Sequence, residues 1–174
     1  MLRNIIFAIL IIISYLIETT FGNVISLAGI IPNLVLIVVC MFALLRGKKA
    51  GLILGFFAGL LIDIFYGYFD VIGINALLYM YIGFINGIFN DIIYIKNYHI
   101  PVIAVGLSDL SYSLCYYFVT YMLRNKLNFG YYFGHIIVPE MVYTIFCTVI
   151  IFKFILRINS KIDDFEKRRE TSVD

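Results

Sequence analysis

The chain has 174 residues, of which 63% are hydrophobic and 14% charged, and its formal net charge at pH 7 is +2. Apolar stretches of this extent exceed what a small soluble core can bury, so the composition excludes an ordinary soluble domain. It predicts an all-α membrane protein that crosses the bilayer several times.

Six apolar segments are predicted to cross the membrane, with about 20 residues allowed for each crossing. Together they form one compact transmembrane bundle over residues 1–157, and a charged cytoplasmic tail follows over 158–174. The six segments span 4–21, 30–45, 50–66, 71–90, 100–123 and 132–156.

The first segment has some features of a secretory signal, because Arg3 precedes an apolar run over 5–17. Glu-Thr-Thr-Phe follows at 18–21, where a small-residue cleavage site is expected. We therefore expect an uncleaved first helix, with Glu18 near its outer end.

The second segment opens with Pro32 and Asn33. Pro32 suits the first turn of a helix, where its missing N–H is not needed. Asn33 offers a polar side chain at the predicted outer boundary of the membrane.

The third segment carries a stripe in which every fourth residue is either glycine or aspartate. Four residues advance a helix by about 40° past one turn, so the stripe forms a ridge that a second backbone can approach closely. It predicts tight packing against another helix of the chain or against a transmembrane helix of a partner. The stripe consists of Gly51, Gly55, Gly59, Asp63 and Gly67.

Glycines also mark the fourth segment, with Gly73 near its outer start and Gly83 and Gly87 toward its inner end. They too permit close helix approach. The turn at 124–135, between the fifth and sixth segments, is rich in aromatic residues and predicts an interfacial aromatic belt. A loop that grips a ligand is the alternative.

The loop charges predict the orientation of the bundle. If the amino terminus is cytoplasmic, Arg124 and Lys126 are the two cations on the outer side, and the other eleven are inside. This asymmetry places both termini in the cytoplasm. It also assigns the cations to orientation and contact with lipid headgroups rather than to nucleic-acid binding. The inner cations are Arg3, Arg46, Lys48, Lys49, Lys96, Lys153, Arg157, Lys161, Lys167, Arg168 and Arg169.

Four acidic residues lie within the predicted spans, namely Glu18, Asp63, Asp109 and Glu140. An ionised carboxylate near the bilayer centre costs roughly 2.5 to 3.5 kcal/mol, so each should face protein or water, or be protonated. Asp109, near the middle of the fifth span, bears the largest cost. Two interpretations stay open: the acids hold helices together and shape a partner surface, or they converge on a proton or cation pathway.

Candidate catalytic and metal-binding residues are not found in the sequence. His99 and His135 fall on opposite sides of the membrane, and Cys40, Cys115 and Cys147 show no paired spacing. There is no phosphate-binding glycine loop, nucleophile elbow or zinc-protease motif. We therefore predict a protein that is not an enzyme and that binds no metal or cofactor.

The order of several motifs resembles the bacterial rod shape-determining protein MreD family, over nearly the whole chain. The second segment supplies Ile-Pro-Asn-Leu-Val-Leu-Ile at 31–37, with Pro32 and Asn33. The third and fourth supply the glycine stripe with Asp63, and then Gly73-Ile-Asn-Ala-Leu at 73–77. Pro-Glu-Met-Val-Tyr at 139–143 opens the last helix.

That resemblance implies a non-enzymatic scaffold of cell elongation in the bacterial inner membrane. The implied partner is the bitopic shape protein MreC. With it, such a protein links the actin-like filament MreB to peptidoglycan synthases, a RodA-type glycosyltransferase and a class B penicillin-binding protein. The implied fold is similar to the six-helix substrate-binding subunits of energy-coupling-factor transporters.

Two other functions stay open. One is a vitamin-binding subunit of an energy-coupling-factor transporter. Those subunits commonly carry Ala-x-x-x-Ala on the first helix, whereas here Ala8 is followed four residues later by Ile12. The other is an ion or proton carrier built on Asp109.

Overall fold

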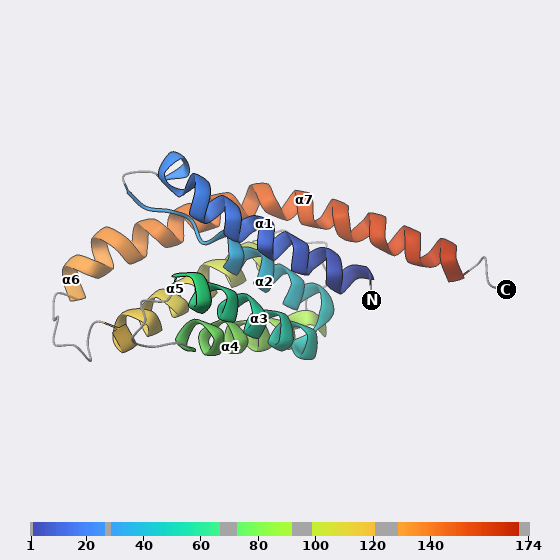
Figure 1. Ribbon diagram of the computed structural model, residues 1–174, viewed down its shortest axis with the longest axis horizontal. Coiled ribbons are helices and arrows are strands. Elements are labelled where there is room, and N and C mark those ends of the chain that lie inside the picture. Colours follow the sequence, from blue (N-terminus) through green and yellow to red (C-terminus); the bar gives the residue numbers. More distant parts are fainter. Residues whose placement is uncertain (1, 27–28, 67–72, 92–98, 121–128, 171–174) are drawn as a thin grey trace.

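The computed structural model describes residues 2–26, 29–66, 73–91, 99–120 and 129–170, and among these the side chains of 5–26, 29–65, 73–90, 99–120 and 129–162. These parts of the chain are predominantly helical, and α7 extends beyond the other helices (Figure 1). The α-helices are α1 (Leu2–Ile25), α2 (Leu34–Arg46), α3 (Lys48–Tyr66), α4 (Ile74–Ile88), α5 (His99–Thr120), α6 (Phe129–Tyr132) and α7 (Val138–Glu170). A 3-10 helix, η1 (Phe89–Asp91), follows α4, and a π-helix, η3 (Phe133–Ile137), joins α6 to α7.

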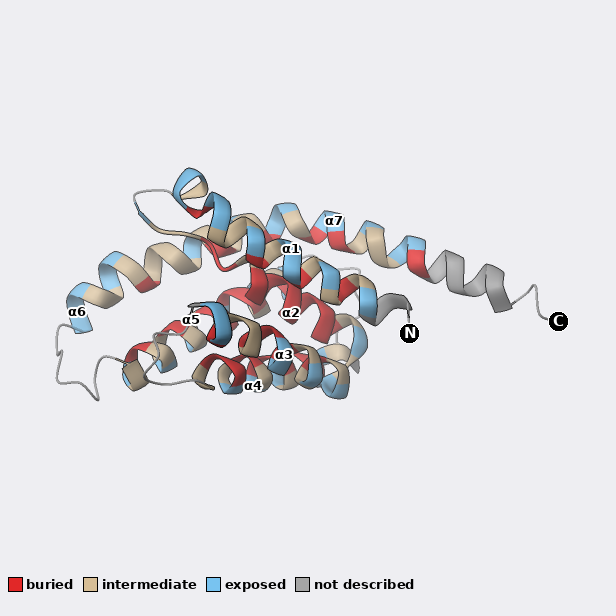
Figure 2. Cartoon of the chain, viewed as in Figure 1, coloured by how far each residue is buried: buried red, intermediate tan, exposed pale blue. Residues whose placement is uncertain are grey.

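Helix α2 forms the centre of the bundle. All ten residues from Val35 to Leu44 are buried, and α1, α3, α4, α5 and α7 pack around them (Figure 2). On one side the ring of Phe42 lies 4.7 Å from that of Phe7 in α1. A helix that is apolar on every side belongs in the interior of a bundle.

The outer faces of the surrounding helices carry large exposed apolar side chains. Phe65 is 72% exposed, Ile64 and Phe146 64%, and Leu107 62%. Water would not tolerate so much apolar surface on a small protein, whereas lipid would cover it. Three helical stretches are long and apolar enough to cross a bilayer, namely Ile5–Ile25, His99–Thr120 and Phe129–Ile162.

The other helices differ from the six full-length spans that the sequence predicts. The apolar helices α2 and α4 have 13 and 15 residues, about 20 and 23 Å, which is short of the roughly 30 Å hydrocarbon layer. Helix α3 has 19 residues and begins with two lysines, Lys48 and Lys49. Six crossings therefore stay a prediction, while the all-helical class and three membrane-spanning candidates are established.

The expectation that Pro32 occupies the first turn of a helix is wrong. Helix α2 begins at Leu34, and Asn33 is its N-cap, so Pro32 lies outside the helix. At the other end the chain turns back at Gly47, whose φ of +83° is a backbone conformation that favours glycine. Helix α3 starts at the next residue.

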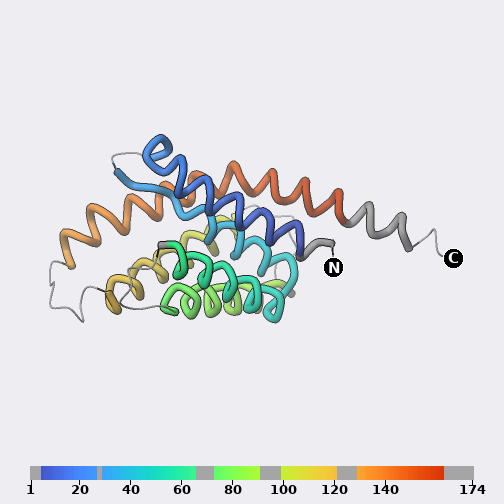
Figure 3. Tube along the Cα trace, in the orientation of Figure 1, coloured from blue at the N-terminus to red at the C-terminus, as the bar shows by residue number. Residues whose placement is uncertain are grey.

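Helices α3 and α4 run antiparallel and in close contact, as Figure 3 traces. A Cβ added at Gly51, Gly55 or Gly59 would collide with the backbone of α4. The carbonyl groups that it would meet belong to Gly83, Tyr79 and Asn75, respectively. The three glycines of the stripe therefore face α4 of the same chain, and a partner helix would have to dock elsewhere. Gly67 lies outside the described residues.

The last helical stretch is continuous from α6 through η3 into α7. The N–H of Val138 donates to the carbonyl of Phe133, five residues earlier, where the helix is locally widened. Pro139 follows directly, and a proline lacks the N–H and crowds the preceding turn of a regular α-helix. The π-helix accommodates this proline, and the helix then continues to Glu170.

Candidate functional site

The polar interior gathers at the ends of the bundle where α2 and α4 begin. Asn33 is its central residue, because its side chain caps α2 by accepting from the Leu36 N–H at 3.0 Å. The same oxygen accepts from the Tyr79 hydroxyl at 2.8 Å, and the Asn33 N–H donates to the Thr144 hydroxyl oxygen at 3.2 Å. One asparagine thus joins α2 to α4 and α7.

Glu18 supplies a second cap to α2 from a different helix. Its carboxylate accepts from the N–H of Val35 at 2.9 Å. The first N–H groups of a helix have no partner within it, and a negative charge there is favourable. The acid at the outer end of α1 is therefore held at the start of α2.

Asp63 has the same role at the start of α4 and receives more hydrogen bonds. One carboxylate oxygen accepts from the N–H groups of Gly73 and Ala76, at 3.1 and 2.9 Å. The other accepts from the N–H and the side-chain amide of Asn75, at 3.3 and 2.9 Å. Gly73 has a φ of +107°, and its backbone N–H faces the carboxylate. Asp63 thus adds hydrogen bonds at the start of α4 to the close packing that the glycines of the stripe make with the same helix.

Asp109 is fully buried in the middle of α5, yet its carboxylate is poorly satisfied. The side chains of Thr144 and Asn33 lie next to it and can act as donors. Neither oxygen has a donor within hydrogen-bonding geometry among the described residues. None of the described groups that act on it electrostatically is a cation.

Three of the four acids converge. The carboxyl group of Glu140, at the start of α7, lies near those of Asp109 and Glu18, and the Ser113 side chain is close to it. Glu18 in turn is repelled by Asp109. Asp63 is separate from this group and is linked to it through Asn75, which accepts from the Tyr112 hydroxyl at 2.8 Å. Glu18, Asp109 and Glu140 therefore lie near one another, and their convergence on one proton or cation pathway stays a prediction.

Two adjoining cavities, of about 200 and 260 Å³, lie beside Glu140, and Glu18 borders the smaller one, whereas Asp109 lines neither. Ile62, Tyr112 and Glu140 line both of them. The first is bordered by Glu18 and the capping region of α2, and the second by aromatic residues of α5 and α6. Each is large enough for several water molecules or a small polar group.

Tyr79 is the member of this network that sequence reasoning missed. It is 1% exposed, donates to Asn33 and lies edge-on to Tyr112 with ring centroids 5.2 Å apart. Its spacing could have indicated this position. Tyr79 lies four residues from both Asn75 and Gly83, and this interval places the three residues on one face of α4. The family-like residues Pro32, Asn33 and Gly73 all lie at the two capped helix starts.

No group of three side chains that could hold a metal ion occurs within the described residues. Some predicted features cannot be placed at all. Arg124, Lys126, Lys96 and the last four residues of the tail lie outside the described part of the chain.

Comparison with known protein families identifies the family of this chain. The family model described as rod shape-determining protein MreD matches residues 1–160 of the 174. No curated protein and no solved structure matches the chain. The predicted similarity to transporter subunits is therefore not supported by any solved structure.

Proposed function

Since this chain belongs to the MreD family and is thereby a bacterial membrane protein of rod shape determination, we propose that it is a non-enzymatic scaffold of the cell-elongation complex. The observation that carries the proposal is the family match over residues 1–160. Its polar side chains support it too, because Asn33, Glu18 and Asp63 serve as helix caps between elements rather than as a catalytic set.

The proposed partner is MreC, a bitopic protein, and through it the filament protein MreB and the cell-wall synthases. In this arrangement the RodA-type glycosyltransferase and the class B penicillin-binding protein are indirect partners. A rigid bundle suits such a role, because packed elements present a partner surface of fixed geometry. The tight α3–α4 contact and the buried α2 supply that rigidity.

The proposed topology has six crossings, with both termini in the cytoplasm and the charged tail at 158–174 on the inner side. Support comes from the loop cations, eleven of which fall on that side against two outside. The short helix α2 fits because all its residues from Val35 to Leu44 are buried, so that protein rather than lipid surrounds it. A fold like that of the energy-coupling-factor substrate subunits is part of this proposal.

The proposal is tested by co-purification. The full chain, tagged at its carboxyl terminus, is extracted gently from native membranes, and the proteins that accompany it are identified by mass spectrometry. Recovery of MreC with cell-wall synthases is expected. Recovery of a coupling subunit and ATPases in their place would make this a transporter subunit.

A second candidate is favoured by the proximity of Asp109 to Glu18 and Glu140, which line the smaller polar cavity. This is passage of protons or cations through Asp109. Proteoliposomes that contain the purified chain would then show flux, and the flux would disappear in Asp109→Asn. A scaffold shows none in either protein.

A further inference from the structure

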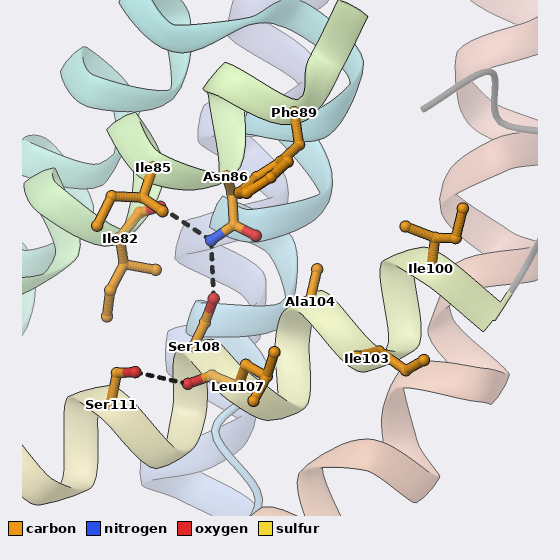
Figure 4. Close-up of a pocket in the computed structure, with 10 residues that line it drawn as sticks. All are labelled: Ile82, Ile85, Asn86, Phe89, Ile100, Ile103, Ala104, Leu107, Ser108 and Ser111. Carbon is orange, nitrogen blue, oxygen red and sulfur yellow. Dashed lines mark hydrogen bonds between the residues drawn. The ribbon is translucent and has the colours of Figure 1, made fainter. Parts of the chain in front are cut away.

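A groove of about 370 Å³ runs between α4 and α5 on the lipid-facing side of the bundle (Figure 4). Apolar side chains form its two rims, with Ile85 on α4 and Ile103 and Leu107 on α5 between 51% and 62% exposed. The groove lies away from the capped helix starts, and it shares no lining residue with the two polar cavities.

The α5 side of the groove presents small residues at helical spacing. Ala104, Ser108 and Ser111 line it at intervals of four and three residues. Small residues separated by four positions let a second helix approach closely within a membrane. The hydroxyl of Ser111 is already bonded to the carbonyl of Leu107 at 2.8 Å, so it adds little polarity to the surface.

Asn86 supplies the amide group of the groove, and the oxygen of this amide has no hydrogen-bond donor among the described residues. The side chain is 3% exposed, and its nitrogen donates to the Ile82 carbonyl at 2.9 Å and to the Ser108 hydroxyl at 2.7 Å. No described residue donates to its oxygen, which Figure 4 shows on the side of the amide away from Ser108. The nitrogen also lies 3.6 Å from the Cys40 Sγ. A flipped amide would place two carbonyl oxygens against each other at Ile82, which favours this orientation.

An acyl chain is a poor occupant for this groove. A hydrocarbon tail has no donor, and an amide oxygen left unpaired among apolar groups is costly. A helix fits both features, because its backbone can approach Ala104 and Ser108 while one side chain donates to Asn86. The donor would be the hydroxyl or amide of Ser, Thr, Asn or Gln within an otherwise apolar segment.

We propose that the α4–α5 groove is the docking site for a transmembrane helix of a partner protein, which donates a side-chain hydrogen bond to the amide oxygen of Asn86. This inference rests on the proposed scaffold function and names the surface through which it acts. The sequence had suggested the glycine stripe of α3 as a docking site for a partner helix. Because α4 covers that stripe, we assign this role to the groove instead.

Photo-crosslinking of the full chain in native membranes tests the proposal. Benzoylphenylalanine replaces Leu107 at the groove rim, and in a control it replaces Phe57 on the outer face of α3, which is 61% exposed. Crosslinked peptides are identified by mass spectrometry. The expected product from position 107 is a membrane-spanning segment of another protein that contains Ser, Thr, Asn or Gln, and position 57 does not give it. Adducts with lipid alone, with a second copy of this chain, or with a segment outside the membrane would overturn the proposal.

Two variants then isolate the oxygen of Asn86. Asn86→Leu and Ser108→Ala both remove the bond between these residues, but only the first removes the oxygen that the partner would use. The crosslink from position 107 should fall about fivefold in Asn86→Leu, as expected for one hydrogen bond of typical net strength, and should persist in Ser108→Ala. Equal yields in the two variants would contradict the proposed contact.

A third variant covers the case in which Asn86→Leu fails to accumulate. Ala104→Phe fills the groove from the lipid-facing side, and it should abolish the crosslink while the protein level in the membrane is unchanged. An undiminished crosslink would overturn the proposal.

The groove proposal and the scaffold proposal can fail independently of each other. If MreC co-purifies while position 107 crosslinks only lipid, the scaffold function stands without this groove. If the docked helix belongs to a protein unrelated to cell-wall synthesis, the groove stands and the scaffold function falls.

Discussion

At the scale of single residues, the acids within the bundle divide into two kinds. Asp63 accepts four hydrogen bonds from residues 73–76, and Glu18 caps α2 through Val35. Asp109, by contrast, is buried without a donor in bonding geometry among the residues that the structure describes. The same residue type is therefore structural at one position and costly at another, and the difference lies in the partners that the fold supplies.

The first prediction follows for Asp63→Asn. The new amide nitrogen would face backbone N–H groups that need acceptors, so at least one hydrogen bond is lost and a buried donor is left unpaired. We expect a loss of about 1 to 3 kcal/mol in stability. Thermal melting of the purified protein in detergent, followed by circular dichroism, measures it. An unchanged melting temperature would show that the carboxylate does not hold α4.

The second prediction concerns Asp109→Asn, which is the same chemical change in the other environment. The amide removes the cost of burying a carboxyl group beside two like groups, and it keeps Thr144 and Asn33 as neighbouring polar side chains. We expect stability to rise by about 1 kcal/mol or more in the same melting experiment. A loss comparable to that of Asp63→Asn would mean that Asp109 is paired as strongly as Asp63.

At the scale of elements, the contact between α3 and α4 is the most specific in the fold. The third prediction compares two glycine-to-alanine changes. In Gly55→Ala the new methyl group collides with the Tyr79 carbonyl, and we expect a loss of about 1 to 3 kcal/mol. In Gly130→Ala nothing lies within 4 Å, and the higher helix propensity of alanine should stabilise α6 by up to about 1 kcal/mol. Melting temperatures that move in the same direction would refute this account of the stripe.

The sequence predicted where the apolar helices lie, because hydrophobic runs depend on composition alone. It missed the starts of α2 and α4, expected at 30 and 71, because carboxylates from other helices hold those starts. Glu18 and Asp63 are 17 and 10 or more residues away from the groups that they bind. The stripe likewise predicted a close approach, but the choice of α4 as its partner depends on packing that local pattern does not encode. The convergence of Glu18, Asp109 and Glu140 is unpredictable for the same reason.

At the scale of the whole molecule, the fourth prediction concerns orientation. In a background without the native cysteines, Gly130→Cys on α6 and Ser160→Cys on α7 are probed with a membrane-impermeant maleimide. Both positions are exposed, and they lie toward opposite ends of the last helical stretch. We expect Gly130→Cys to react in intact cells and Ser160→Cys to react only after lysis. The reverse pattern would invert the topology.

The bundle as a whole has an apolar outer surface and a polar interior near one end, and its apolar groove opens on another face. This arrangement suits a protein that works by holding membrane partners, since binding surfaces and stabilising contacts are separate. Variants at the helix caps should therefore change stability, whereas variants in the groove should change assembly.

The most direct test of the scaffold function is binding between purified components. The full chain is placed in lipid nanodiscs, full-length MreC is titrated in, and complex formation is measured by fluorescence from a label on MreC. The scaffold account predicts saturable binding that needs no nucleotide, metal or small molecule. Absence of binding to a chain whose circular dichroism shows it to be folded would contradict it.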